Sequence, residues 1–250
     1  MRNPEVPTLD TQDPNVVPLE NLGDPAGELS MSSYHAGQPG REPLKGFVRL
    51  IFEKAYGARI DTFYPHLIGI RREDGSFAAV AGVRTAGAGP LYAEQYLDEP
   101  LEVMLSRSSG RPVSRAEVVE VGNLAPAGAG QARWLIAALT AYVHAAGFSH
   151  VVFTAVPALH NAFRRMGLPL TRLATADPSR LAADGKDDWG SYYQAGPQVC
   201  AGRIALGHAV LNDFISARRP RLRRLWRQAQ QLASADRERL HGPAVIRKSA

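Results

Sequence analysis

The sequence of 250 residues contains little cysteine and no long apolar run. Its one cysteine, Cys200, excludes an internal disulfide framework, and seven histidines are scattered without the spacing of metal ligands. No run approaches the roughly 18–20 apolar residues that a membrane-spanning helix needs. The first residues lack the apolar segment of a secretory signal. These absences predict a cytoplasmic protein without a metal site.

Positive charge is concentrated near the C-terminus. Residues 218–250 contain ten Lys and Arg against two acids, a net +8, which leaves −3 of the total +5 for residues 1–217. No base-reading motif accompanies this charge, so nucleic acid is not the expected partner. Three interpretations stay open: a solvated helix face, a surface for an acidic partner such as acyl-carrier protein or the acidic N-terminal segment, or peripheral contact of residues 218–227 with an anionic membrane. In the last, Leu222, Leu225 and Trp226 would insert into the bilayer.

Composition divides the chain into three parts. Residues 1–33 hold five prolines and six acids without apolar periodicity, which predicts a disordered segment. Residues 34–208 carry the patterns of a folded α/β domain. Residues 209–250 are predicted to form a basic helical C-terminal extension and tail.

The first half of the domain contains a helix and a hairpin. Apolar residues at helical spacing predict a helix over 43–56. Two β-like runs, 66–71 and 77–83, flank Asp74 and Gly75, a hairpin signal. A third run, 91–96, is predicted to be a strand, and a short helix is expected after residues 98–99.

The centre of the chain predicts a βαβ unit. A buried strand over 118–121, with a bulge at Gly122, precedes a helix over 131–146 that has almost no polar face. A second strand follows over 150–156, and the two strands should be parallel neighbours. A helix over 157–166, a strand over 199–206 and helical spacing from residue 211, resumed after Pro220, complete the pattern.

The turn from Pro126 to Gly130 lies between the strand and the long helix. Backbone N–H groups and the helix dipole make such a turn suitable for phosphate or pyrophosphate, although similar turns also occur only to connect a strand to a helix. Arg133, on the first turn of the helix, could contact the same phosphate, or could be a solvated helix residue.

The order of these elements resembles the GNAT acyltransferase superfamily, in which the equivalent turn holds the pyrophosphate of acyl-coenzyme A. A more specific resemblance, to the thermostable hemolysin family, rests on residues 82–84, 94–98, 119–125 and 189–193 and covers about residues 34–204. That family is grouped with GNAT folds and is distantly similar to acyl-homoserine-lactone synthases. The resemblance therefore implies a mixed central sheet flanked by helices.

Two positions depart from the GNAT pattern. Ala125 stands where a Gln or Arg is usual, and Phe163 stands where a tyrosine often acts as general acid. An ordinary acetyl-coenzyme A mechanism is therefore not expected.

Two acids are candidates for catalysis. Glu120 interrupts a valine-rich strand, where burial raises the pKa of a carboxyl group and suits a general base. A structural ion pair with Arg84 or Arg115 would explain it equally well. Glu94 is the second candidate, with an exposed strand face as the alternative.

The turn and the resemblance together imply two sets of binding residues. Those expected to bind the cofactor are Leu124, Ala125, Gly128, Ala129, Gly130, Gln131 and Arg133, and those expected to bind substrate are Arg84, Tyr96, Asn123, Trp189 and Tyr193. Alternatively, Asn123 satisfies backbone groups beside the bulge, and the aromatic residues belong to the core.

These expectations lead to two hypotheses of function. The first is an N-acyltransferase that moves an acyl group from acyl-coenzyme A, or from the phosphopantetheine thioester of acyl-carrier protein, to a small amine without a metal. The second is a membrane-active protein, lytic as the family name says, that acts through the basic C-terminal helix.

Overall fold

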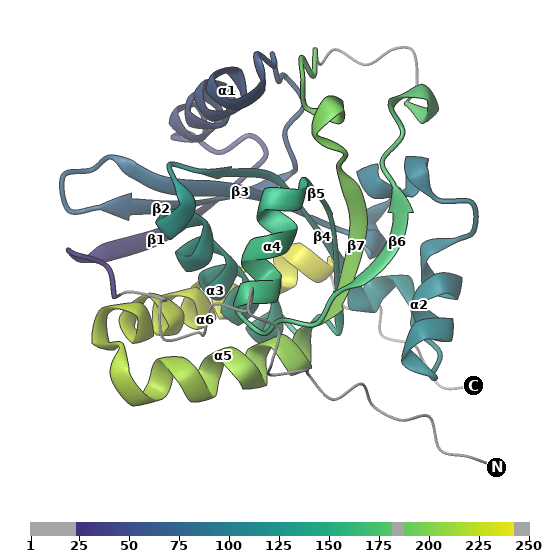
Figure 1. Ribbon diagram of the computed structural model, residues 1–250. Coiled ribbons are helices and arrows are strands. Elements are labelled where there is room, and N and C mark those ends of the chain that lie inside the picture. The colour runs from purple at the N-terminus through teal and green to yellow at the C-terminus, as the bar shows by residue number, and fades with distance from the viewer. Residues whose placement is uncertain (1–23, 182–187, 243–250) are drawn as a thin grey trace.

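The computed structural model describes residues 24–181 and 188–242 (Figure 1). The strands are β1 (Leu29–His35), β2 (His66–Arg72), β3 (Phe77–Thr85), β4 (Val118–Pro126), β5 (His150–Ala155), β6 (Thr171–Thr175) and β7 (Gln198–Arg203). The α-helices are α1 (Glu42–Tyr56), α2 (Leu101–Ser109), α3 (Ala129–Ala145), α4 (Pro157–Arg165), α5 (Ile204–Arg218) and α6 (Pro220–His241). The 3-10 helices are η2 (Ala86–Ala88), η3 (Tyr92–Tyr96), η4 (Arg115–Glu117), η5 (Pro178–Arg180) and η6 (Tyr193–Ala195).

The strands form one mixed sheet in the order β1-β2-β3-β4-β5-β7-β6. Among the described strands, β4 and β5 run parallel, and the other neighbouring pairs are antiparallel. This confirms the predicted hairpin, the parallel pair of the βαβ unit and the mixed sheet flanked by helices of a GNAT-like fold. The β3–β4 register shifts near Gly82 and Gly122, where the bulge was expected.

The two faces of the sheet are covered by different helices, because successive strand residues point to opposite sides. Leu67 and Val80 pack with α1, whereas Ile68 and Ala81 pack with α3 and α6. Figure 1 shows α1 on one side of the sheet and α3, α5 and α6 on the other.

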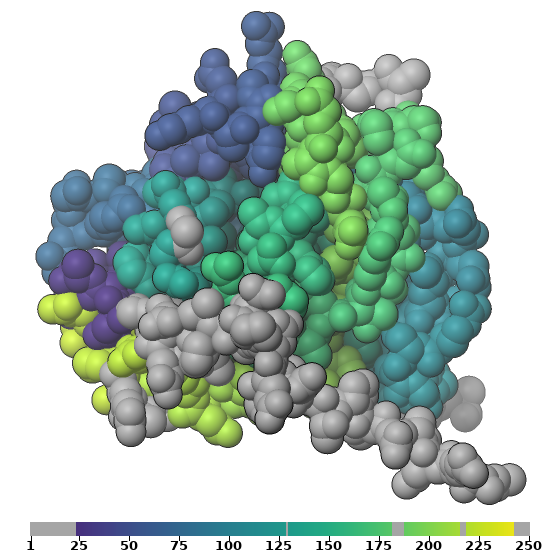
Figure 2. Space-filling model, in the orientation of Figure 1, coloured from purple at the N-terminus to yellow at the C-terminus, as the bar shows by residue number. Residues whose placement is uncertain are grey.

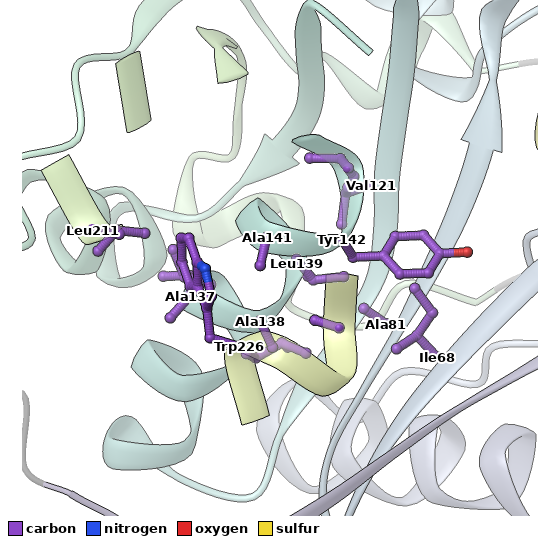
Figure 3. Packing of buried hydrophobic residues seen from close by; sticks show 14 of the residues in the cluster. Ile68, Ala81, Val121, Ala137, Ala138, Leu139, Ala141, Tyr142, Leu211 and Trp226 are labelled. Carbon is purple, nitrogen blue, oxygen red and sulfur yellow. The ribbon is translucent and has the colours of Figure 1, made fainter. Parts of the chain in front are cut away.

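Helix α3 lacks a polar face because it is enclosed. It lies between the sheet on one side and α5 and α6 on the other. In Figure 3, Tyr142 extends toward the strands that carry Ile68 and Ala81, and Trp226 of α6 lies on the other side of α3, near Ala137. The alanines of α3 allow the neighbouring helices to approach closely, and a helix that is apolar all round is expected to be buried in this way.

Helix α6 is part of the core and not a separate extension. It packs on α3 and on β1, and Leu222, Leu225 and Trp226 are buried. The prediction that these three residues insert into a membrane is therefore wrong. The boundary expected at residue 209 also falls inside α5. The predicted helices themselves are confirmed: α5 ends at Arg218, and α6 begins at Pro220, which is tolerated in the first turn of a helix but not in its interior.

A buried polar network joins α6 to the first strands. The Asp236 carboxylate accepts hydrogen bonds from the Ser33 hydroxyl (2.5 Å) and the Tyr142 hydroxyl (2.9 Å), and its Oδ1 lies 3.1 Å from His35 Nε2. The other ring nitrogen of His35 contacts His66. These contacts stabilise β1, whose residues 29–33 belong to the segment predicted to be disordered. That prediction is wrong for these residues, and residues 1–23 lie outside the described part.

The strand predicted over 91–96 is a 3-10 helix, η3. Its first N–H groups are taken by acidic side chains: Leu91 donates to Glu94, and Tyr92 and Ala93 donate to Glu120. Acidic caps of this kind stabilise a helical turn over an extended strand. Strand β6, on the far edge of the sheet beside β7, was not predicted either.

Removing the Trp226 side chain tests whether α6 belongs to the core. We expect Trp226→Ala to lower the free energy of unfolding by about 3–5 kcal/mol, because it leaves a cavity against α3. Arg227→Ala, an exposed change on the same helix, is expected to stay within about 0.5 kcal/mol of the unchanged protein. Urea unfolding measures both, and equal effects would contradict this packing.

Acid should weaken the β1–β2–α6 contact. The pKa of His66 is lowered to about 4, mainly by burial and to a smaller extent by the nearby His35. Unfolded histidine titrates near 6.5, so the unfolded state binds more protons between these values, and stability is lost as the pH falls from about 6.5 toward 4. His66→Gln is expected to remove part of this loss, on the order of 1–2 kcal/mol after solvent screening.

Urea unfolding at several pH values measures the effect. His160→Gln, outside the network, serves as the control. An unchanged pH dependence in His66→Gln would show that this histidine does not couple to folding.

Candidate active site

Strands β4 and β5 separate after Glu120. Their parallel pairing runs only from Val118 opposite His150 to Glu120 opposite Val152. Beyond that point β4 continues beside β3 and β5 continues beside β7. The separation exposes backbone groups and side chains at the middle of the sheet, and the cavities described next all meet there.

On the α1 side of the sheet, the separation opens into an aromatic cavity. Its lining consists of Phe52, Tyr56, Thr62, Tyr64, Tyr92, Tyr96, Val121, Gly122, Asn123, Leu124, Thr154, Val156, Leu159, Trp189, Tyr192 and Tyr193. The structure therefore brings together four of the five predicted substrate residues: Tyr96, Asn123, Trp189 and Tyr193. The Tyr96 and Tyr193 hydroxyls are 2.6 Å apart.

The segment after residue 188 closes one side of this cavity. Trp189 packs edge-on against Phe52 of α1, and Ser191 donates its N–H to the Tyr56 carbonyl oxygen. In Figure 2 this light-green segment adjoins the blue-violet α1 at the top of the molecule. Thr154 also lines the cavity, and its Oγ1 is buried without a hydrogen-bond partner in the described chain. The cavity thus combines aromatic walls with an unsatisfied hydroxyl.

Glu120 lies beneath the aromatic cavity and not in its lining. The residue is 1% exposed, its carboxylate accepts the N–H groups of Tyr92 (2.8 Å) and Ala93 (2.7 Å), and the side chain of Tyr64 interacts with it. Burial raises the pKa of this carboxyl group, although these hydrogen bonds oppose the effect. Glu120 is therefore a buried acid with a raised pKa, as predicted.

Tyr64 is the functional candidate that the sequence did not indicate. A Cβ on Gly122 would lie 2.6 Å from the Tyr64 hydroxyl oxygen, and a Cβ on Gly82 would lie 2.7 Å from Tyr64 Cβ. Gly82 and Gly122 are paired across β3 and β4, so together they form a slot that only a pair of glycines leaves open. Two glycines inside neighbouring strands were the available signal.

Backbone contacts hold Tyr64 in this slot. Asn123, at a left-handed φ of 46°, accepts the Tyr64 N–H at 2.9 Å and donates to the Thr62 carbonyl oxygen at 3.1 Å. The buried Arg41 guanidinium donates to the carbonyl oxygens of Tyr64 and Pro65. The Asn123 side chain is thus bonded to the backbone, the alternative that its place beside the bulge suggested.

Arg84 also contacts Tyr64. Its guanidinium carbon lies 4.7 Å from the centre of the Tyr64 ring. Arg84 faces Glu120 across the β3–β4 ladder but does not line the aromatic cavity. Its predicted contact with substrate stays a prediction.

Glu94 is engaged in supporting structure. Its carboxylate accepts the Leu91 N–H at 2.7 Å and forms a two-pronged pair with Arg115, which also binds Glu102 at 3.1 Å. Burial acts to raise the pKa of Glu94, but the bonds from Arg115 and Leu91 leave it below its usual value. Glu94 does not line the aromatic cavity, and the structure gives it the role of a helix cap. Arg115 is therefore not the ion-pair partner of Glu120.

A groove between the start of α3 and α4 continues the aromatic cavity toward the surface. It measures about 590 Å³ and is lined by Tyr56, Leu124, Pro126, Gly128, Ala132, Arg133, Val156, Ala158, Leu159, Asn161, Ala162 and Arg165. Four of these residues, Tyr56, Leu124, Val156 and Leu159, line the aromatic cavity as well. None of the described residues that line this α3–α4 groove has an acidic side chain.

Arg133 and the helix start give this groove positive potential. The Nε of Arg133 is buried without a hydrogen-bond partner among the described residues. Helix α3 begins at Ala129, and its first N–H groups have no partner within the helix. A Cβ on Gly130 would meet nothing within 4 Å, so there is open space above the turn. These features suit an anionic group.

The remaining predicted cofactor residues differ in position. Leu124 and Gly128 line the α3–α4 groove, and Gln131 lies on the first turn of α3, its Oε1 near Gly128. Ala125, in contrast, is fully buried and packs with the α1 core. The Ala125 side chain therefore does not reach the groove.

A second, mostly apolar pocket lies on the α3 side of the separated strands. Its walls include Ile136, Leu139, Phe153, Phe163 and Leu168, and it shares Val121 and Leu124 with the aromatic cavity. Phe163 stacks on Phe153 with ring centres 4.7 Å apart. The residue in place of the usual GNAT tyrosine is thus an apolar wall.

Residues 24–181 and 188–242 contain neither a group of metal ligands nor a helix that could cross a membrane. No three His, Cys, Asp or Glu side chains there lie close enough together to hold a metal ion. No helix in the same ranges is both long and apolar enough to cross a bilayer.

The family model described as Thermostable hemolysin matches residues 34–208. The chain belongs to the thermostable hemolysin family. This confirms the resemblance drawn from residues 82–84, 94–98, 119–125 and 189–193. No curated protein matches the chain.

Several solved structures are similar to this thermostable hemolysin family member. FeeM, an N-acyl amino acid synthase from uncultured soil microbes, is 17% identical with a TM-score of 0.49, over 74% of this chain and 97% of FeeM. TofI in an apo form is 16% identical with a TM-score of 0.49, over 73% of this chain and 96% of TofI. The acyl-homoserine-lactone synthase LasI is 12% identical with a TM-score of 0.47, over 73% of this chain and 91% of LasI. At these identities and scores, the similarities assign no activity to this chain.

A methyl group on Gly122 tests the glycine slot. Gly122→Ala should displace Tyr64 and lower the free energy of unfolding by about 1–3 kcal/mol, the usual cost of overpacking. Gly130→Ala, in open space within α3, should not destabilise and could add up to about 1 kcal/mol. Thermal or urea unfolding compares the two variants. An unchanged free energy of unfolding in Gly122→Ala would contradict a tight fit of Tyr64 against Gly122.

Proposed function

We propose that this protein is an N-acyltransferase that moves an acyl group from a phosphopantetheine thioester to a small amine. One observation carries the proposal: the α3–α4 groove, with its helix N-terminus and unpartnered Arg133 Nε, runs into the aromatic cavity above Glu120 and Tyr64. A ligand with a phosphate at one end and a reactive group at the other fits this path.

Each part of the path has a proposed role. The turn 126–130 and Arg133 hold the donor phosphate, and Arg165 at the groove wall adds a second cation. Phosphopantetheine lies between the separated strands, where backbone N–H groups of β4 beyond its pairing with β5 stabilise the developing oxyanion. The apolar pocket receives the acyl chain, which favours acyl groups longer than acetyl. Glu120, with its raised pKa, accepts the proton of the amine.

The donor in this proposal is either acyl-coenzyme A or acyl-carrier protein, because both present the same phosphopantetheine thioester. The amine enters the aromatic cavity beside Tyr96, Trp189 and Tyr193. A cytoplasmic location stays a prediction. The membrane-active alternative required Leu222, Leu225 and Trp226 to insert into a bilayer. These residues are instead buried against α3 and β1.

Donor binding is the test of the proposal. Isothermal titration of the full chain with acetyl-, octanoyl- and dodecanoyl-coenzyme A should show binding that is tighter for the longer chains. Arg133→Ala should weaken octanoyl-coenzyme A binding on the order of tenfold, because it removes a charged hydrogen-bond donor. Arg223→Ala, exposed on α6, is the matched control and should bind like the unchanged protein.

Acyl-carrier protein loaded with an octanoyl group provides the second arm. Binding in this arm alone would identify the donor as the carrier protein. The proposal fails if neither donor binds and no amide appears by mass spectrometry when octanoyl thioesters are mixed with primary amines.

A further inference from the structure

Glu120 cannot reach a substrate in the aromatic cavity directly. It is 1% exposed, it is absent from the cavity lining, and each of its carboxylate oxygens already accepts a backbone N–H. Tyr64 does line the cavity, and its side chain interacts with the same carboxylate. The Tyr64 hydroxyl is therefore the atom through which Glu120 meets the cavity.

From this arrangement we infer that Tyr64 is a catalytic residue that relays protons between the substrate and Glu120. The inference rests on the proposed acyl transfer and deepens it. A tyrosine hydroxyl donates one hydrogen bond and accepts others, so it can pass a proton in both directions without a lasting charge.

The proton balance of the relay is complete. As the amine nitrogen bonds to the thioester carbon, its proton moves to Tyr64 Oη, and the Tyr64 proton moves to Glu120. When the carbon–sulfur bond breaks, the pair returns one proton to the departing thiolate by the reverse path. The products are an amide and a free thiol, and Glu120 is again a carboxylate. Tyr64 thus supplies the acid that Phe163 cannot provide.

Five separate residues fix the position of this one hydroxyl. Gly82 and Gly122 leave room for the ring, Asn123 and Arg41 hold the backbone on either side of it, and Arg84 lies against its face. A ring that served only to fill the core would not need two strand glycines and two hydrogen-bonding side chains that hold its backbone. Burial keeps the pKa of the Tyr64 phenol well above its usual value, so the group stays protonated at neutral pH and ready to donate.

Kinetics give the first test. With octanoyl-coenzyme A and a set of primary amines, Tyr64→Phe should lower kcat about 10²- to 10³-fold and change the KM for octanoyl-coenzyme A less than about threefold. Glu120→Gln should cause a similar loss, and the double variant should lose little more, because the two residues act as one unit. Tyr34→Phe, which removes a hydroxyl outside the cavity, should keep the unchanged rate. Full activity in Tyr64→Phe would overturn the relay and leave the proposed function standing.

Nuclear magnetic resonance gives a test that does not depend on turnover. In the full chain labelled with ¹³Cζ-tyrosine, the Tyr64 signal should shift as Glu120 titrates, and this shift should be absent in Glu120→Gln. A Tyr64 signal that ignores the titration would contradict the relay. Absence of donor binding and of amide product, with the shift present, would overturn the proposed function instead.

Should Tyr64→Phe fold poorly, 3-fluorotyrosine at position 64 keeps the shape and makes the phenol more acidic. The pH–rate profile should then move, and a superimposable profile would count against the relay.

Discussion

The buried carboxylate of Glu120 is the constraint on which the centre of this molecule depends. A carboxyl group that is 1% exposed inside a valine-rich strand is costly unless hydrogen bonds satisfy it. Two N–H groups from η3 meet that need, and Tyr64 interacts with the same carboxylate. The requirement therefore draws η3, the segment around Tyr64 and β4 to one point, and it places an ionisable group below the aromatic cavity.

The separation of β4 and β5 turns this point into a site. Because the two strands stop pairing after Glu120, the α3–α4 groove, the aromatic cavity and the apolar pocket meet at Val121 and Leu124. The helix start and Arg133 lie at one end of this path, and Tyr64 and Glu120 lie at the other. The same carboxylate that organises the local fold is thus positioned to act on a thioester held between the strands.

Sequence patterns predicted the elements that depend mainly on residues close together in the chain. The periodicity of 43–56, the Asp74-Gly75 turn and the βαβ order all gave the correct elements, and a lone acid among valines indicated that Glu120 is buried. Long-range contacts decided the rest. Strand β1 is stabilised by β2 and by α6 through Asp236, η3 is capped by an acid 27 residues away, and Tyr64 is positioned by glycines on two other strands. Nothing in the residues beside these segments encodes such partners.

Hydrogen–deuterium exchange of the full chain, with and without octanoyl-coenzyme A, tests whether a thioester donor binds between the separated strands. We expect slower exchange in peptides that cover residues 122–133 and 189–193, with no change in α6. Unchanged exchange at residues 122–133, or protection confined to α6, would contradict a donor site between the separated strands.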